Sequence, residues 1–280
     1  MNVKVAENAG FCFGVERAVD MVYKEAMRGD NVYTFGSIIH NEQVVRELEQ
    51  QNVKVVNNLE ELRRMPKGTI IIRSHGVSKA VQDAMENMGF RVVNATCPFV
   101  IKIHKIVFEK SNEGRQIIII GNEDHPEVMG INGWCHDKAI IVKDEKDVEK
   151  ISLEEGSKVC IVAQTTFNYK KFEVLVEIIS KKRYDIIAFN TICNATEVRQ
   201  REARELASVS DAMLVVGGKH SSNTQKLYEI CKKECINTYY IQTVSDLNLD
   251  IIKSFHNVGI TAGASTPNKI IKEVQIACQK

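Results

Sequence analysis

The stretch DIIAFNTICNATEVRQREAREL, residues 185–206, combines a short apolar run, a small-residue turn, a cysteine and a helical pattern. The same order occurs twice earlier in the chain, in VKVAENAGFCFGVERAVDMVY (3–23) and in RVVNATCPFVIKIHKIVF (91–108). Because one supersecondary pattern recurs at intervals of roughly 90 residues, the sequence indicates a threefold internal repeat.

A second apolar run follows each of these stretches and ends in a glycine. The glycine lies 24 residues after the cysteine in all three cases, at Gly36, Gly121 and Gly217. Equal offsets favour equivalent positions in a repeated fold, and they predict that three thiols are brought to one centre: Cys12, Cys97 and Cys193.

Each repeat contains four units in which an apolar strand is followed by an amphipathic helix, as in TIIIRSHG (69–76) and SKAVQDAMENMG (78–89). Strands of four to six continuous apolar residues that alternate with helices are typical of parallel sheets covered on both faces. The predicted fold class is therefore α/β, with three small pseudo-threefold-related domains, each a parallel sheet flanked by helices.

Composition narrows the class of protein. The 280 residues are 44% apolar, which suits two or three domains, and 37 basic residues balance 36 acidic ones. The balanced charge gives no long-range electrostatic attraction for nucleic acid or an anionic membrane. No secretion signal and no apolar run long enough to span a bilayer is present, so a soluble, cytoplasmic protein is expected. In that compartment, eight cysteines favour thiol chemistry over disulfides.

Reactive side chains gather in the loops that follow the predicted strands. In parallel sheets these loops lie at the carboxyl edge, where ligands bind. Besides the three cysteines, the loops hold His40, Asn41, Ser74, His75, Gly76, His125, Glu127, Gln164, Thr165, Thr166, Ser221, Ser222, Asn223, Ser265 and Thr266. We expect the three sets to converge on one cavity.

Glu127 is a candidate proton donor, because a carboxyl in a closed cavity can have its pKa raised towards neutrality. The alternative is an acid that stabilises a helix N-terminus. The loops GGKHSSNT (217–224) and GASTPN (263–268) place hydroxyls and backbone N–H groups at helix starts, which suits a phosphate or diphosphate. Each could equally be a plain N-cap.

Cys12, Cys97 and Cys193 allow several interpretations. Three thiolates can hold a [4Fe–4S] cluster with one iron open to substrate. A structural zinc site, a single catalytic thiol and ordinary packing are the alternatives. Packing is expected for the other five cysteines, Cys135, Cys160, Cys231, Cys235 and Cys278. The alternative for Cys231 and Cys235 is a metal site, because they have helical i, i+4 spacing, but no His or acidic partner is evident.

Several segments together resemble the LytB/IspH family: GFCFGVERAV, GSIIHN, RSHGV, NATCPFV, HPEVMG, QTTF, TICNATEVRQ, KHSSNT and GASTP. The resemblance covers essentially the whole chain. It implies three α/β domains, 14–96, 97–192 and 193–280, with the strand in 1–13 grouped with the third. It also implies one [4Fe–4S] cluster per chain, held by Cys12, Cys97 and Cys193.

The activity that the resemblance implies is the reduction of 4-hydroxy-3-methylbut-2-enyl diphosphate to isopentenyl and dimethylallyl diphosphate. This is the last step of the methylerythritol phosphate route to isoprenoids. The substrate hydroxyl would bind the open iron, and ferredoxin or flavodoxin would supply two electrons.

Site roles are carried over by matching motif. Glu127 would feed protons, with Thr165 in its hydrogen-bond network and His125 nearby. The diphosphate would be held by His40, His75, Ser221, Ser222, Asn223 and Ser265, with His125 and Thr166 close by. Two positions depart from the family pattern, the bulky Phe13 and His220, and both concern local pocket shape.

Two other classes of protein remain as rivals at this point. One is a cluster enzyme of the quinolinate synthase kind, which would use its open iron without net electrons. The other is a non-enzymatic cluster sensor or zinc-stabilised binding module. The HPE, QTTF and KHSSN segments favour the reductase, and neither a basic recognition helix nor an interaction tail supports a sensor.

Overall fold

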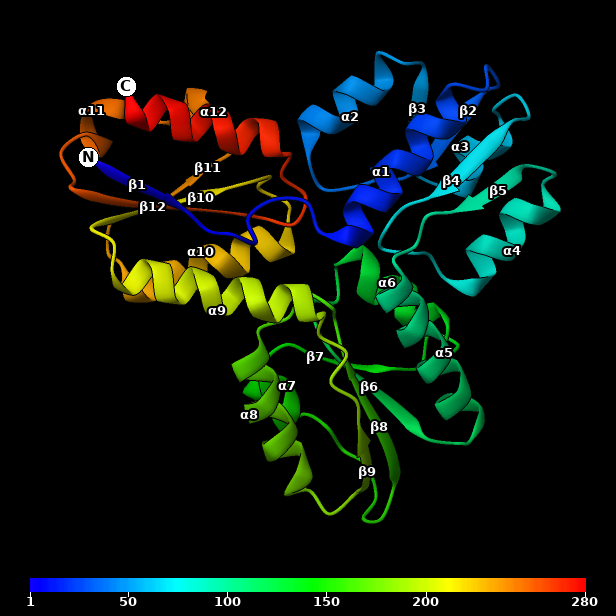
Figure 1. Cartoon of the computed structure of the whole chain (residues 1–280). Helices are drawn as coiled ribbons and strands as arrows, with labels where there is room; N and C mark the ends of the chain where they lie inside the picture. Colours follow the sequence, from blue (N-terminus) through cyan, green and yellow to red (C-terminus); the bar gives the residue numbers. More distant parts are fainter. The chain divides into compact units, whose positions relative to one another are not determined.

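The computed structural model describes residues 1–280 and contains three four-stranded parallel sheets (Figure 1). Their strand orders are β1-β12-β10-β11, β3-β2-β4-β5 and β7-β6-β8-β9. In each sheet one strand lies between its two successors along the chain, and the strand that precedes a cysteine stands at the edge. The fold class expected from the sequence is confirmed: α/β, with three parallel sheets flanked by helices.

The elements of the first sheet come from both ends of the chain. They are β1 (Asn2–Val5), α9 (Asn194–Ser208), β10 (Ala212–Val216), α10 (Ser222–Glu234), β11 (Thr238–Ile241), a 3₁₀ turn η1 (Val244–Asp246), α11 (Leu249–Ile252), β12 (Asn257–Ala262) and α12 (Asn268–Gln279).

The elements of the other two sheets follow the chain without interruption. For the second sheet they are α1 (Phe13–Ala26), β2 (Val32–Phe35), α2 (Glu42–Glu49), β3 (Val53–Val56), α3 (Leu59–Arg63), β4 (Thr69–Ile72), α4 (Lys79–Asn87) and β5 (Arg91–Asn94). For the third they are α5 (Pro98–Asn112), β6 (Gln116–Ile120), α6 (Pro126–Gly133), β7 (Ile140–Val142), α7 (Glu145–Glu149), β8 (Lys158–Ala163), α8 (Tyr169–Ser180) and β9 (Asp185–Ala188).

The chain divides into two compact units. Unit 1 comprises residues 1–16, 40–44 and 193–280, and unit 2 comprises residues 17–39 and 45–192. Unit 1 holds the first sheet, and unit 2 holds the other two. The finer division into domains 14–96, 97–192 and 193–280 stays a prediction.

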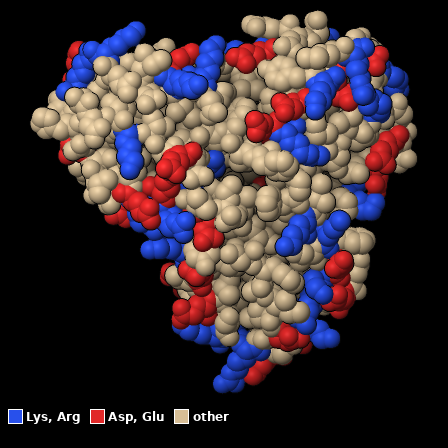
Figure 2. Space-filling view, in the orientation of Figure 1, with Lys and Arg blue, Asp and Glu red and all other residues tan.

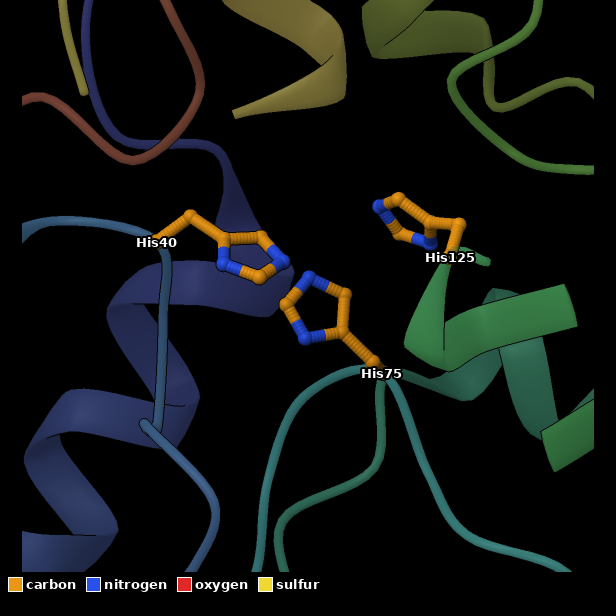
Figure 3. A group of neighbouring side chains, drawn as sticks. All are labelled: His40, His75 and His125. Carbon is orange, nitrogen blue, oxygen red and sulfur yellow. The ribbon is translucent and has the colours of Figure 1, made fainter. Parts of the chain in front are cut away.

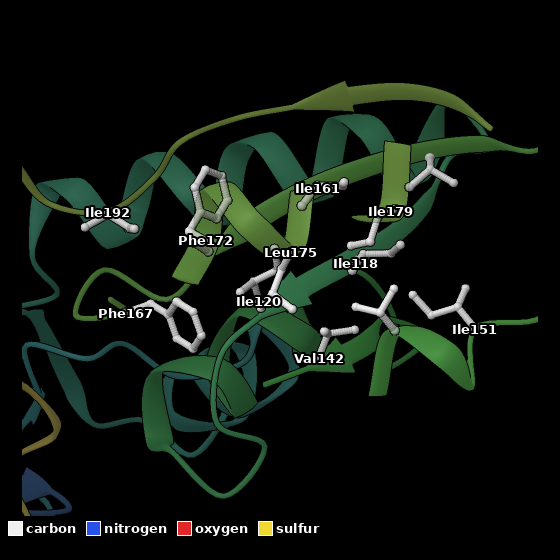
Figure 4. Packing of buried hydrophobic residues seen from close by; sticks show 13 residues of the cluster. Ile118, Ile120, Val142, Ile151, Ile161, Phe167, Phe172, Leu175, Ile179 and Ile192 are labelled. Atoms are coloured by element: carbon white, nitrogen blue, oxygen red, sulfur yellow. The ribbon is translucent and has the colours of Figure 1, made fainter. Parts of the chain in front are cut away.

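The run QIIII in β6 shows why the strands are continuously apolar. Ile118 and Ile120 pack on one face of their sheet with α7 and α8, in a cluster that includes Phe172 and Leu175 (Figure 4). Ile117 and Ile119 point to the opposite face, where they meet α5 and α6. Since strand side chains alternate between faces, a sheet covered on both sides needs apolar residues at every position. Burying one such isoleucine contributes about 1.5–3 kcal/mol.

Unit 1 is built on the same plan. Leu214 and Val216 of β10 pack against α11 and α12, whereas Met213 and Val215 pack against α9 and α10. The strand β1 pairs in parallel with β12, with Val3 opposite Val258, so the first strand completes the last sheet. Figure 1 shows the N-terminus beside the C-terminal helix α12 accordingly.

The exposed surface carries both signs of charge. On the face drawn in Figure 2, Lys and Arg side chains are intermixed with Asp and Glu, and the chain has nearly equal numbers of the two kinds. None of the helices combines the length and the apolar character that crossing a membrane would demand.

Candidate functional site

Glu127 is a buried carboxyl at the start of α6. Its exposed fraction is 2%, and both of its oxygens accept hydrogen bonds from Thr165. The backbone N–H of Thr165 donates to Oε1 at 2.6 Å, and the hydroxyl donates to Oε2 at 2.7 Å. Burial raises the pKa of Glu127 to about 7, although both bonds from Thr165 act to lower it. The carboxyl can therefore hold or release a proton near neutral pH.

His125 is the N-cap residue of α6, and its Nδ1 accepts the backbone N–H of Glu127 at 3.1 Å. Because Nδ1 is an acceptor, a neutral imidazole carries its hydrogen on Nε2. Pro126 occupies the first helical position, where its missing N–H is harmless. The sequence H-P-E thus fixes a histidine and an acid at one helix start.

His75 lies against His125, with ring centroids 5.4 Å apart and planes at 85° (Figure 3). Its loop follows β4 and is tied to the first cysteine of unit 2, since the backbone N–H of Cys97 donates to Ser74 O at 2.9 Å. Gly76 has a left-handed φ of +75°, and a Cβ there would lie 2.7 Å from Cε1 of His104. A residue with a side chain would disturb the His75 loop.

Gln164 links the loops that carry Asn122 and Thr166. Its Oε1 accepts the backbone N–H of Asn122 at 3.1 Å, and its Nε2 donates to the hydroxyl of Thr166 at 3.0 Å. Unit 2 thus brings together Cys97, His75, His125, Glu127, Thr165 and Thr166.

Unit 1 assembles the hydroxyl-rich loops. Ser221 is the N-cap of α10, and its Oγ accepts the backbone N–H of Thr224 at 3.3 Å. Ser222 is the first helical residue. Asn223 is 3% exposed, and neither polar atom of its amide has a hydrogen-bond partner. A buried amide left unpaired is costly, and a polar ligand at this position could satisfy it.

The segment that carries His40, also drawn in Figure 3, belongs to unit 1 and packs on these loops. The hydroxyl of Ser265 donates to His40 O at 3.1 Å. A Cβ at Gly218 would lie 2.5 Å from the same oxygen, so the close approach requires glycine. His40, Ser221, Ser222, Asn223 and Ser265 form the candidate set of unit 1.

The three repeat cysteines share a position that the other five lack. Cys97 and Cys193 are the N-cap residues of α5 and α9, and Cys12 directly precedes α1. All three are half-buried, whereas the other five are fully buried, and no disulfide is formed. The three thiols therefore lie at the positive ends of helix dipoles.

A family model described as LytB protein matches residues 3–279. The chain belongs to the LytB family.

Among its relatives is the 4-hydroxy-3-methylbut-2-enyl diphosphate reductase of Caldanaerobacter subterraneus subsp. tengcongensis, 47% identical over 98% of this chain and 95% of the relative. The reductase of the same name from Clostridioides difficile is 45% identical over 98% of both chains.

Two solved structures have the same fold. The E-1-hydroxy-2-methyl-but-2-enyl-4-diphosphate reductase from Plasmodium falciparum superposes with a TM-score of 0.91 at 28% identity, covering 98% of this chain and 86% of that one. A structure titled (E)-4-hydroxy-3-methyl-but-2-enyl diphosphate reductase, the terminal enzyme of the non-mevalonate pathway, gives 0.70 at 39% identity, covering 100% and 99%. The resemblance inferred from the sequence is confirmed.

Membership in the LytB family implies an iron–sulfur cofactor, and the donors present fit one. Three thiols at helix starts are the ligand type that such clusters take. The buried guanidinium of Arg199 in unit 1 interacts with the charges of both Cys12 and Cys193 and keeps one N–H group, Nη1, without a partner. A negatively charged group at the two sulfurs would suit this cation.

Two arginines of the LytB chain were missed by the sequence analysis. In unit 2, Arg17 Nη1 donates to the carbonyls of Ala95 and Thr96, just before Cys97, at 3.4 and 3.2 Å. In unit 1, Arg199 donates to carbonyls that precede Cys12. The signal was their spacing, five and six residues after a repeat cysteine, which the repeat comparison could have exposed.

Proposed function

We propose that this chain reduces 4-hydroxy-3-methylbut-2-enyl diphosphate to isopentenyl diphosphate and dimethylallyl diphosphate, the last step of the methylerythritol phosphate (non-mevalonate) pathway. The observation that carries this function is the 45–47% identity, along 98% of the chain, to reductases of that name. The balanced reaction consumes two electrons and two protons, breaks one C–O bond and releases one water.

The diphosphate is assigned to the hydroxyl-rich loops. Ser221, Ser222 and Asn223 of unit 1 would donate hydrogen bonds to its oxygens, together with His40. Ser265 would join them by turning its hydroxyl from His40 O to the ligand. The N-terminus of α10 adds backbone N–H groups and the positive end of the helix dipole. The buried, unpartnered amide of Asn223 supports this assignment, because an oxygen of the ligand would satisfy its Nδ2. His75, His125 and Thr166 of unit 2 complete the proposed set.

Glu127 is assigned as the proton donor. Its carboxyl has the pKa that general acid catalysis near pH 7 needs, and the bonds from Thr165 hold it in one orientation. Thr165 would pass hydrogen bonding from Glu127 to the substrate hydroxyl, which leaves as water. His125 is oriented by the same helix start and would lie next to the donor.

Cys12, Cys97 and Cys193 are proposed to hold one [4Fe–4S] cluster. When bound, the cluster supplies the two electrons in single steps and a Lewis-acidic iron. The protein supplies orientation, protons and exclusion of water. A ferredoxin or a flavodoxin is the proposed electron donor.

The test is anaerobic purification followed by iron and sulfide counts, an absorption spectrum and a turnover assay with the allylic diphosphate and a reduced dye. We expect about four irons per chain and formation of both products. A colourless protein after reconstitution, or a loaded protein that leaves the substrate unchanged, would overturn the proposal.

A pair of variants tests the ligand assignment. Cys193→Ser should lose or destabilise the cluster. Cys231→Ser should keep it, because burial raises the pKa of the Cys231 thiol to about 12 and its Sγ contacts Ala203 O in the core of unit 1. An intact cluster in the Cys193 variant would contradict the three-cysteine assignment.

A further inference from the structure

Two side chains of α9 hold the loop that leads to Cys12. The carboxylate of Glu202 accepts the backbone N–H groups of Glu7 and Asn8, the second at 3.0 Å. The guanidinium of Arg199 donates from Nε to Asn8 O at 2.7 Å and from Nη2 to Gly10 O at 2.8 Å. One helix thus holds three residues, Glu7, Asn8 and Gly10, of a loop segment that ends two positions before Cys12.

The same helix begins at the other cysteine of unit 1. Cys193 is the N-cap of α9, and Arg199 follows it by six residues. Side chains on a helix point back towards its N-terminus, so the guanidinium reaches from the second turn towards the first. Arg199 therefore couples the positions of Cys12 and Cys193.

The charge of Arg199 is buried and lacks a full set of partners. The residue is 3% exposed, and its Nη1 is inaccessible to solvent and bonded to nothing. Burial lowers its pKa, while the negative charges that oppose this effect belong to Cys12, Cys193 and Glu202. A guanidinium stays protonated in proteins, so a positive charge is retained near Cys12 and Cys193.

We propose that Arg199 is a positioning residue for the Cys12 and Cys193 thiolates and that its positive charge raises the reduction potential of the cluster they hold. Reduction adds one electron, supplied by the ferredoxin or flavodoxin donor, so the net charge of the cluster becomes more negative by one. A fixed cation in a region of low dielectric constant stabilises the reduced form more than the oxidised form.

This inference rests on the proposed function. Cluster binding by the wild-type protein distinguishes a failure of the proposed function from a failure of the inference about Arg199. If the wild type binds no cluster, the proposed function fails. If the wild type is loaded and titrates, the variants decide the role of Arg199 alone.

The experiment is an anaerobic redox titration of the loaded protein, followed by electron paramagnetic resonance, with iron and sulfide counted on the same samples. Arg199→Gln removes the charge and Arg199→Lys keeps it. The matched control is Arg201→Gln, which removes a charge from an exposed position on the same helix.

In Arg199→Gln we expect a tenfold shift of the equilibrium towards the oxidised cluster, which is about 59 mV for one electron. Arg199→Lys should hold less iron, because an ammonium cannot bond both carbonyls as the guanidinium fork does, but its loaded fraction should keep nearly the wild-type potential. Arg201→Gln should change neither the iron content nor the potential.

An unchanged reduction potential in loaded Arg199→Gln would overturn the proposal. So would a reduction potential that falls as far in Arg199→Lys or in Arg201→Gln as it does in Arg199→Gln. If Arg199→Gln cannot be loaded, the uncharged Arg199→Met takes its place. A tenfold shift in the loaded fraction of Arg199→Met, with Arg199→Lys at the wild-type potential, supports the charge effect, and an unchanged potential in Arg199→Met contradicts it.

Discussion

Replacing Glu127 with Gln keeps the shape of the side chain and removes its proton. A Gln can still accept the backbone N–H of Thr165 through Oε1 and can donate to its hydroxyl, so the local structure should persist. Positioned proton donors contribute about 10²–10⁴-fold to rate. We expect turnover to fall about 100-fold or more, with the cluster and substrate binding retained.

The pH dependence follows from the pKa of Glu127, which burial raises from 4.5 to about 7. At pH 7 about half of the carboxyls are protonated, and the protonated fraction falls about tenfold for each further pH unit. Wild-type turnover should decline above pH 7, and the residual turnover of Glu127→Gln should lack this decline.

The pH dependence of the free energy of unfolding provides an independent test of the raised pKa of Glu127. Between pH 4.5 and 7 the native state keeps a proton that the unfolded state has lost, so the native state is destabilised as pH rises through this window. At about 1.4 kcal/mol per pKa unit, the loss is about 3 kcal/mol. Glu127→Gln does not titrate, and its free energy of unfolding should gain about 3 kcal/mol on the wild type across the same window.

Urea unfolding at several pH values, together with steady-state turnover, measures both effects. Glu123→Gln is the matched control, because Glu123 is an exposed acid in the loop that precedes α6. Near-normal turnover in Glu127→Gln would remove this residue from proton delivery. A stability difference that does not vary with pH would refute the raised pKa.

The other predictions concern residues around the donor and the His75 loop. Thr165→Val removes a hydrogen bond that lowers the pKa of Glu127, so the alkaline decline of turnover should move to higher pH; a move to lower pH in the rate profile would contradict this reasoning. Gly76→Ala should lower the free energy of unfolding by about 1–2 kcal/mol because of the left-handed φ, and by a further amount because the new Cβ meets His104. The control Gly89→Ala, at φ +76° with nothing within 4 Å, should show the backbone strain alone. Equal losses for the two variants in urea unfolding would show that the His104 contact is unimportant.

The layered fold could be predicted because its signal is local. Runs such as QIIII show that both faces of a strand are covered, and the following amphipathic helix shows what covers them. The order of strands within each sheet could not be read this way, because pairing such as that between β1 and β12 joins residues more than 250 positions apart.

The candidate site could be predicted as a set of residue types but not as a set of contacts. Glu127 and Thr165 stood out as polar residues after apolar strands. That one threonine donates to both carboxylate oxygens depends on how the loops after β6 and β8 meet, which no local pattern encodes.

Arg199 escaped notice for a different reason. A helical arginine among TEVRQRE is usually a solvated residue, and only the tertiary structure shows that the loop before Cys12 covers it. The i, i+4 pair Cys231 and Cys235 agrees with the packing expected from the sequence, since both thiols are buried in the core of unit 1 and contact backbone carbonyls.

The pairing of β1 with β12 sets an order for events during biosynthesis. The strand before Cys12 leaves the ribosome well before its partner strand, and at about 5–20 residues per second the interval is on the order of 10–50 s. During that time Cys12 has neither the sheet edge nor α9 to hold it. The native position of this cysteine is therefore reached only after translation of residue 257 and its neighbours, and a nascent chain stalled before β12 would expose an oxidisable thiol with no partner strand.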